Sequence, residues 1–153
     1  MIYDCGVIYD CGLNTVDTST RPSLKNDIAF GLNNESIVID KLSKYFNESI
    51  EKTKEKYCPY DAFSPTTKYE IKSRRCKSFT YDTTIIPIKK VESVKDRLVF
   101  VFHFTDGLFY IVYNQELFDT FEKKNVTYYR QGGSNLPVLH YFIPVKDLIE
   151  IVL

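Results

Sequence analysis

The sequence contains no long apolar run and no secretion signal, and these absences exclude two classes of protein. No stretch approaches the roughly 18 to 20 apolar residues that a membrane-spanning helix needs. Residues 1–12 lack both the basic start and the long apolar segment of a signal peptide. We therefore expect an intracellular chain, cytoplasmic or nuclear and not secreted, without a membrane as partner.

The sequence also lacks the motifs of a zinc site. Its four cysteines stand at positions 5, 11, 58 and 76, none in a CxxC pair, and only two histidines are present. We predict reduced thiols. His103 alternates with apolar residues of a predicted strand, so we interpret it, like His140, as a structural histidine and not a ligand.

An excess of charge is missing as well, because 20 Lys and Arg balance 20 Asp and Glu over 153 residues. The basic residues are nevertheless concentrated locally between residues 68 and 77 and just beyond. Such a cluster can neutralise a few phosphates of a nucleic acid. The candidate phosphate contacts are Arg74, Arg75, Lys89 and Lys90.

The length fits one domain, and periodicity indicates an α/β fold. Residues 1–22 form an N-terminal arm with a duplicated hexapeptide, and residues 23–153 form the domain. An apolar stripe of helical period predicts a helix over 27–46. The predicted strands are 57–63, 68–72, 98–105, 108–113, 126–131 and 138–143, with a helix over 115–124 capped by Asn114 and a last helical turn at Asp147.

Two of these strands bring two carboxylates and one ammonium group to the same face of the sheet. If residues 64–67 form the turn, Ala62 pairs with Tyr69, and Asp61 then lies opposite Glu70 on the same face of the sheet. Strand alternation adds Lys72 to that face. Opposed carboxylates repel each other unless a cation relieves them, and either Lys72 or a hard divalent metal, bound also by the carbonyl of Ile71, would do so.

Glu35 supplies a third carboxylate. It stands at a position of the apolar stripe through which the first helix should meet the sheet. A buried carboxylate needs a cationic partner, which the same metal site would provide, whereas a position at the edge of the stripe would let Glu35 reach solvent.

The arrangement Asp61, Glu70-Ile71-Lys72 and an upstream helix carrying Glu35 resembles the PD-(D/E)XK nuclease superfamily over about residues 27–113. Pro59 stands two residues before Asp61, one further than the motif has it. The resemblance implies a restriction-endonuclease-like mixed sheet flanked by helices. It also implies an Mg²⁺- or Mn²⁺-dependent nuclease with Asp61, Glu70, Ile71 and Glu35 at the metal and Lys72 at the attacking water.

Several alternatives remain open from the sequence. The substrate would be DNA, or possibly RNA, and cleavage of both strands would require a homodimer or successive events. The frequent Tyr, Ile, Asn and Lys residues would suit an AT-rich genome. Small nucleases of the family that the chain resembles occur in phages and large DNA viruses, which suggests such an origin. A non-catalytic nucleic-acid-binding or protein-interaction module, or an unrelated α/β protein, would fit the same composition. A second Glu-x-Lys, at Glu122 to Lys124, is expected to end a helix and to have no catalytic role.

Overall fold

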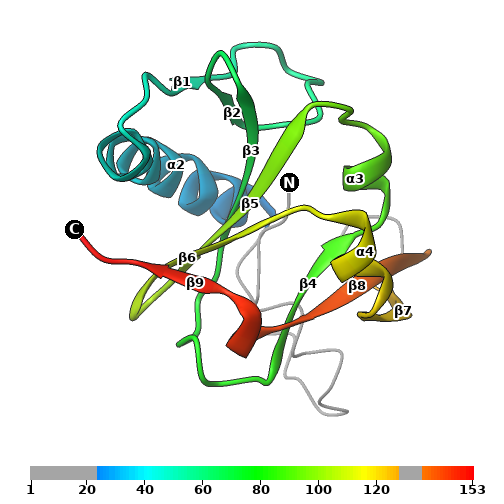
Figure 1. Cartoon of the computed structure of the whole chain (residues 1–153). Helices are drawn as coiled ribbons and strands as arrows, with labels where there is room; N and C mark the ends of the chain where they lie inside the picture. Colours follow the sequence, from blue (N-terminus) through cyan, green and yellow to red (C-terminus); the bar gives the residue numbers. More distant parts are fainter. Residues whose placement is uncertain (1–23, 128–135) are drawn as a thin grey trace.

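The computed structural model describes residues 24–127 and 136–153, and the duplicated N-terminal hexapeptide lies outside them. It is a mixed α/β fold with two sheets and few helices (Figure 1). The helical segments are α2 (Leu24–Phe46), α3 (Lys89–Glu92), α4 (Gln115–Asp119) and the 3-10 turn η2 (Val145–Asp147). The strands are β1 (Glu51–Lys52), β2 (Ala62–Phe63), β3 (Thr67–Ser73), β4 (Thr83–Pro87), β5 (Arg97–Phe104), β6 (Gly107–Val112), β7 (Glu122–Thr127), β8 (Pro137–Pro144) and β9 (Ile149–Ile151).

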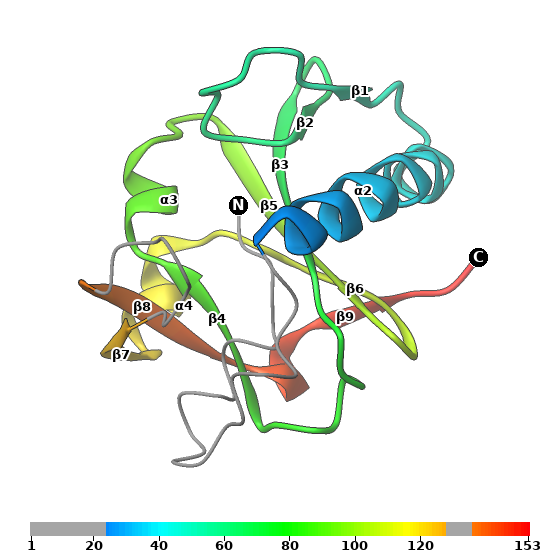
Figure 2. The same cartoon turned by 180° about the vertical axis from the view of Figure 1, so that it is seen from behind.

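The larger sheet has six strands in the order β1-β2-β3-β5-β6-β9. Its centre is parallel, because β3 and β5 run in the same direction, and all its other neighbours are antiparallel. The smaller sheet has the order β4-β8-β7 and is antiparallel throughout. The two views show α2 on one face of the large sheet and the small sheet on the other (Figures 1 and 2).

Each face of the large sheet has its own apolar core. On the helix face, Val38, Ile39 and Leu42 of α2 pack against Tyr69 and Ile71 of β3. On the opposite face, apolar side chains of β5 and β6 pack against the small sheet and α4. The main members of that core are Phe100, Phe102, Ile111, Phe118, Tyr141 and Ile143. The large sheet is therefore covered by α2 on one face and by the small sheet together with α4 on the other.

Most of the predicted elements are present. The first helix, the strand around residues 68–72 and the hairpin at Asp106-Gly107 are confirmed. The cap at Asn114 is confirmed as well, since its side chain accepts a hydrogen bond from the backbone N–H of Leu117. The strand expected over 57–63 is reduced to two residues, and β4 and β9 were not predicted.

The helix predicted over 115–124 is wrong in its second half. It ends at Asp119, and β7 begins at Glu122, so the second Glu-x-Lys lies on a strand. Phe118 and Phe121 are both buried, and the turn between them sends the chain into the small sheet. The predicted strand over 126–131 overlaps the end of β7, and its last four residues lie outside the described ranges.

No helix within residues 24–127 and 136–153 is long and apolar enough to cross a membrane.

Candidate functional site

Strand β3 presents different chemistry on its two faces. Tyr69 and Ile71 point to α2 and belong to the apolar core there. Because side chains alternate along a strand, Glu70 and Lys72 point to the opposite face. Both are 1% exposed. Burial of a carboxylate and an ammonium together is costly unless they pair with each other, so the structure has to supply partners.

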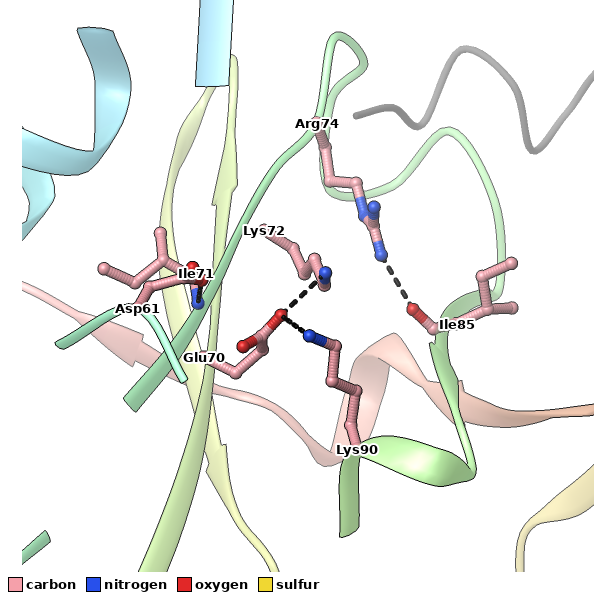
Figure 3. Close-up of polar contacts among 7 residues, drawn as sticks. All are labelled: Asp61, Glu70, Ile71, Lys72, Arg74, Ile85 and Lys90. Atoms are coloured by element: carbon pink, nitrogen blue, oxygen red, sulfur yellow. Dashed lines mark hydrogen bonds and ion pairs between the residues drawn. The ribbon is translucent and has the colours of Figure 1, made fainter. Parts of the chain in front are cut away.

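Glu70 is the centre of a three-residue ion cluster. Its Oε1 lies 2.8 Å from Nζ of Lys72 and 3.0 Å from Nζ of Lys90 on α3 (Figure 3). The side chain of Lys90 is 23% exposed, so the third member of the cluster is the one that meets solvent. One carboxylate with two ammonium groups leaves a net charge of +1, and we call these residues the Glu70 cluster.

Neither carboxylate oxygen of Glu70 makes a hydrogen bond within the described residues, where the two ion pairs both use Oε1. Oε2 is buried and has no hydrogen-bond partner within the described parts of the chain. A buried acceptor without a partner is costly, and in native structures it usually marks a place where a cation, a water or a ligand binds. Oε2 is therefore an acceptor that a hydrogen-bond donor or a cation could use.

The charges in the Glu70 cluster shift each other's protonation. Burial raises the pKa of Glu70, but the ammonium groups of Lys72 and Lys90 outweigh that effect and the pKa is lowered. Burial lowers the pKa of Lys72, and the nearby carboxylate of Glu70 opposes this without cancelling it. Glu70 is thus held as an anion, while the Lys72 ammonium is a stronger proton donor than an exposed lysine.

Asp61 directly precedes β2 and lies beside Ile71, the residue of β3 between Glu70 and Lys72. Its Oδ2 accepts a hydrogen bond of 2.8 Å from the backbone N–H of Ile71 (Figure 3). The predicted register is confirmed, since Ala62 pairs with Tyr69 and Phe63 with Lys68. However, the pairing ends at Ala62, and the N–H of Asp61 donates to the carbonyl of Tyr69. The ladder therefore does not place Asp61 directly opposite Glu70, and a side-chain bond to the strand takes its place.

The carboxyl of Asp61 has a pKa close to neutral pH. Burial and the negative charge of Glu70 raise its pKa to about 7, against a smaller opposing effect of Lys72. Three charged neighbours shift the pKa of Asp61, and Glu35, which raises it, is the third of them. Electrostatic coupling thus joins the residues that the sequence grouped, even where no direct contact does.

Glu35 is buried on α2, as predicted, with 4% exposure. Its Oε2 lies 3.6 Å from Nζ of Lys52 on β1, and burial raises its pKa while Lys52 lowers it. Across the described residues, no three His, Cys, Asp or Glu side chains lie close enough together to hold one metal ion. Glu35 therefore does not share a coordination shell with Asp61 and Glu70 in this arrangement.

The four predicted phosphate contacts are in different environments. Lys89 is exposed, Arg75 is half-buried, and Lys90 belongs to the Glu70 cluster. Arg74 is 2% exposed. Its guanidinium donates to the carbonyl of Ile85 at 2.8 Å (Figure 3). It also donates to Oγ1 of Thr84 at 3.2 Å. Arg74 is thus a link between β3 and β4, and its burial is a correction to the expected surface contact.

Both histidines are at least partly buried, and burial lowers the pKa of each. His140 is fully buried, its Nδ1 lies 2.6 Å from the carbonyl of Val138, and burial lowers its pKa to about 4. His103 is half-buried, and burial lowers its pKa too. Both are neutral at pH 7, which agrees with the structural part that the sequence indicated for them.

The donor chemistry of the site fits a hard divalent cation in part. Asp61, Glu70 and the carbonyl of Ile71 offer only oxygen atoms, which Mg²⁺ and Mn²⁺ prefer, and Oε2 of Glu70 makes no hydrogen bond within residues 24–127 and 136–153. Against this, Oε1 of Glu70 already has two ammonium groups. The sequence indicated the first feature through Glu-x-Lys, but nothing in it marked Lys90 as the second cation on Glu70.

Comparisons of the chain with protein-family models, with curated proteins and with solved structures gave no match.

Proposed function

We propose that the chain is a metal-dependent phosphodiesterase of the PD-(D/E)XK type that acts on DNA, with RNA as the alternative substrate. The observation that carries the proposal is the buried Glu70–Lys72 pair at 2.8 Å, with the Asp61 carboxylate bound to the backbone between them. A mixed sheet with a helix on one face is compatible with a restriction-endonuclease-like fold. A viral or phage origin remains a suggestion of residue usage alone.

The residues divide into two tasks. Asp61, Glu70 and the Ile71 carbonyl would hold Mg²⁺ or Mn²⁺, which when bound would polarise the scissile phosphate and acidify a water. Lys72 would orient the attacking water and offset negative charge that develops on the phosphate. Glu35, coupled electrostatically to Asp61, would act through a water and not as a direct ligand.

Access to the site requires a displacement. Glu70 and Lys72 are each 1% exposed, so a phosphodiester can reach them only after a covering group moves. Lys89 lies exposed on α3 beside Lys90, where it can contact a phosphate of the same strand. Arg75, two residues beyond the C-terminal end of β3, is a second candidate phosphate contact.

A specific observation favours a second candidate, a non-catalytic binding module on the same fold. Each predicted metal-binding carboxylate already has an internal partner: Lys52 for Glu35, the Ile71 N–H for Asp61, and two lysines for Glu70. Carboxylates that are all paired with groups of the protein itself are expected of a protein that binds no metal. Cleavage separates the two candidates, because only the first requires it.

The test is cleavage of plasmid DNA, single-stranded DNA and RNA with Mg²⁺, Mn²⁺ or chelator, by the wild type and by Lys72→Met. We expect metal-dependent cutting that falls about 10²- to 10⁴-fold in Lys72→Met, in the range for loss of a group that transfers or positions a proton. Lys124→Met, in the exposed Glu-x-Lys of β7, is the matched control and should cut normally. Nucleic-acid binding without metal-dependent cutting would favour the binding module.

A further inference from the structure

The Glu70 cluster contains a lysine that the proposed chemistry does not need. We propose that Lys90 and a divalent cation compete for Glu70, so that Lys90 closes the site in the metal-free protein and leaves it when the metal binds. This inference rests on the proposed function only in taking Glu70 as a metal ligand. It assigns Lys90 a regulatory position at the entrance instead of a simple surface contact to phosphate.

The geometry of the cluster supports the competition. Nζ of Lys90 lies 3.0 Å from Oε1 of Glu70, a distance at which a metal ion on the same carboxylate would meet a like charge. Oε1 has two ammonium partners and Oε2 has no hydrogen bond within the described ranges. A cation that bound Oε2 would therefore break no hydrogen bond of the described residues, but it would be repelled by the ammonium groups of both lysines.

Of the two lysines, Lys90 is the one able to leave. Lys72 is 1% exposed and belongs to the centre of the sheet, whereas the Lys90 side chain is 23% exposed and comes from the four-residue helix α3. None of the residues of α3 is buried. An ammonium at the end of a long, flexible side chain is readily hydrated, so rotation of Lys90 into solvent uncovers Glu70 without unfolding of the sheet.

Lys90 also supplies the displacement that access requires. With Lys90 in place the cluster carries a net charge of +1, because two ammonium groups contact the one carboxylate of Glu70. Once a divalent cation is bound, the freed ammonium at the rim has a new anionic partner available in the phosphate of a bound strand. Metal binding and opening of the site are thereby linked, because a ligand shifts an equilibrium by its different affinity for the two states.

The experiment measures binding of Mn²⁺ alone to the full chain by titration calorimetry, in the wild type, Lys90→Met, Lys90→Arg and Lys89→Met. Methionine keeps the apolar stem and removes the charge, while arginine keeps the charge. We expect Lys90→Met to bind Mn²⁺ about tenfold more tightly than the wild type, the lower end of what neighbours of metal ligands contribute. Lys90→Arg and the neighbouring exposed control Lys89→Met should stay near the wild type.

A second measurement uses only the wild-type protein. The ammonium group of Lys90, held by a buried carboxylate, should give a slowly exchanging ¹H–¹⁵N signal in the metal-free state, assigned by its loss in Lys90→Arg. Addition of Mg²⁺ should abolish that signal. Persistence of the signal at saturating Mg²⁺ would overturn the competition even if a variant failed to fold.

The outcomes separate this inference from the proposed function. Normal cutting and Mn²⁺ binding by the wild type, with equal affinity in Lys90→Met and Lys89→Met, would overturn the inference and leave the nuclease standing. Tighter binding of Mn²⁺ by Lys90→Met than by the wild type and Lys89→Met, in a protein that never cuts, would support the inference and contradict the nuclease. Absence of Mn²⁺ binding in every variant would contradict both.

Discussion

The chain contains two Glu-x-Lys tripeptides on strands, and they differ in almost everything except their local geometry. In β3 the Glu70 and Lys72 side chains meet at 2.8 Å and are each 1% exposed. In β7 the Glu122 and Lys124 side chains meet at 3.1 Å and are 61% and 54% exposed. Residues two apart on a strand share a face, so the contact itself follows from spacing alone.

The difference comes from the position of each strand. β3 lies between β2 and β5 inside the six-stranded sheet, with α2 on one face and the small sheet on the other, whereas β7 is an edge strand of the small sheet. An ion pair in water contributes little, because both ions are well hydrated without each other. A buried pair contributes little net stability either, but loss of one partner leaves a charge without compensation. Burial therefore makes each member of the Glu70–Lys72 pair depend on the other for charge compensation, which exposure does not do for Glu122 and Lys124.

The largest stability effect should come from removal of one carboxylate charge in each tripeptide. We expect Glu70→Gln to lower the free energy of unfolding by about 3 kcal/mol, because the Lys72 ammonium then lacks a buried counterion while Lys90 can turn to solvent. Glu122→Gln should change it by less than about 0.5 kcal/mol. Urea denaturation of both variants measures the difference. Equal losses would show that burial does not distinguish the two pairs.

A smaller effect, and one that depends on pH, is expected for Asp61. Its pKa is about 7 in the folded chain and close to 3.8 when exposed, so the folded state binds more protons between these values. The free energy of unfolding should therefore fall as pH rises from about 4 to 7, and the penalty should persist above pH 7. Asp61→Asn should relieve it, by about 2 kcal/mol at pH 8 after allowance for partial exposure and by much less near pH 4.5.

Thermal or chemical unfolding at both pH values, without metal, measures this dependence. The matched control is Asp119→Asn, which alters an exposed acid beside β7 whose carboxylate lies 3.8 Å from Lys123. A parallel pH profile for wild type and Asp61→Asn would show that Asp61 ionises like an exposed acid. If the proposed metal site exists, Mg²⁺ should also remove the penalty from the wild type, because the cation favours the charged carboxylate.

The sequence was sufficient for those parts of the site that depend on local spacing. The turn at residues 64–67 sets the register of β2 with β3, and helical periodicity places Glu35 on the inner face of α2. Both predictions use short-range geometry, and both are confirmed. Strand alternation also places Glu70 and Lys72 on one face, but the sequence did not predict that both would be buried.

Contacts between distant segments were beyond such reasoning. The pairing of Lys90 with Glu70 depends on how β4 and α3 return over β3, and β4 itself was not predicted. Arg74 was expected at the surface because charged residues usually are, yet the small sheet covers it and supplies the carbonyl that it binds. Asp61 departs from its ladder because its carboxylate bonds the strand directly. Each of these outcomes needed the tertiary structure.

The smallest expected effect tests the other half of the comparison. Lys124→Met removes the cation of the exposed pair in β7, and we expect a change of less than about 0.5 kcal/mol in the free energy of unfolding. The little that is lost should vanish in about 1 M salt, where the screening length falls to about 3 Å. Lys72→Met measured in the same salt series should lose stability by an amount that salt does not remove, since Glu70 is shielded from the solvent ions. If salt erased both losses alike, the buried cluster would have to be open to water, and the contrast between the two tripeptides would be one of position without any difference in electrostatics.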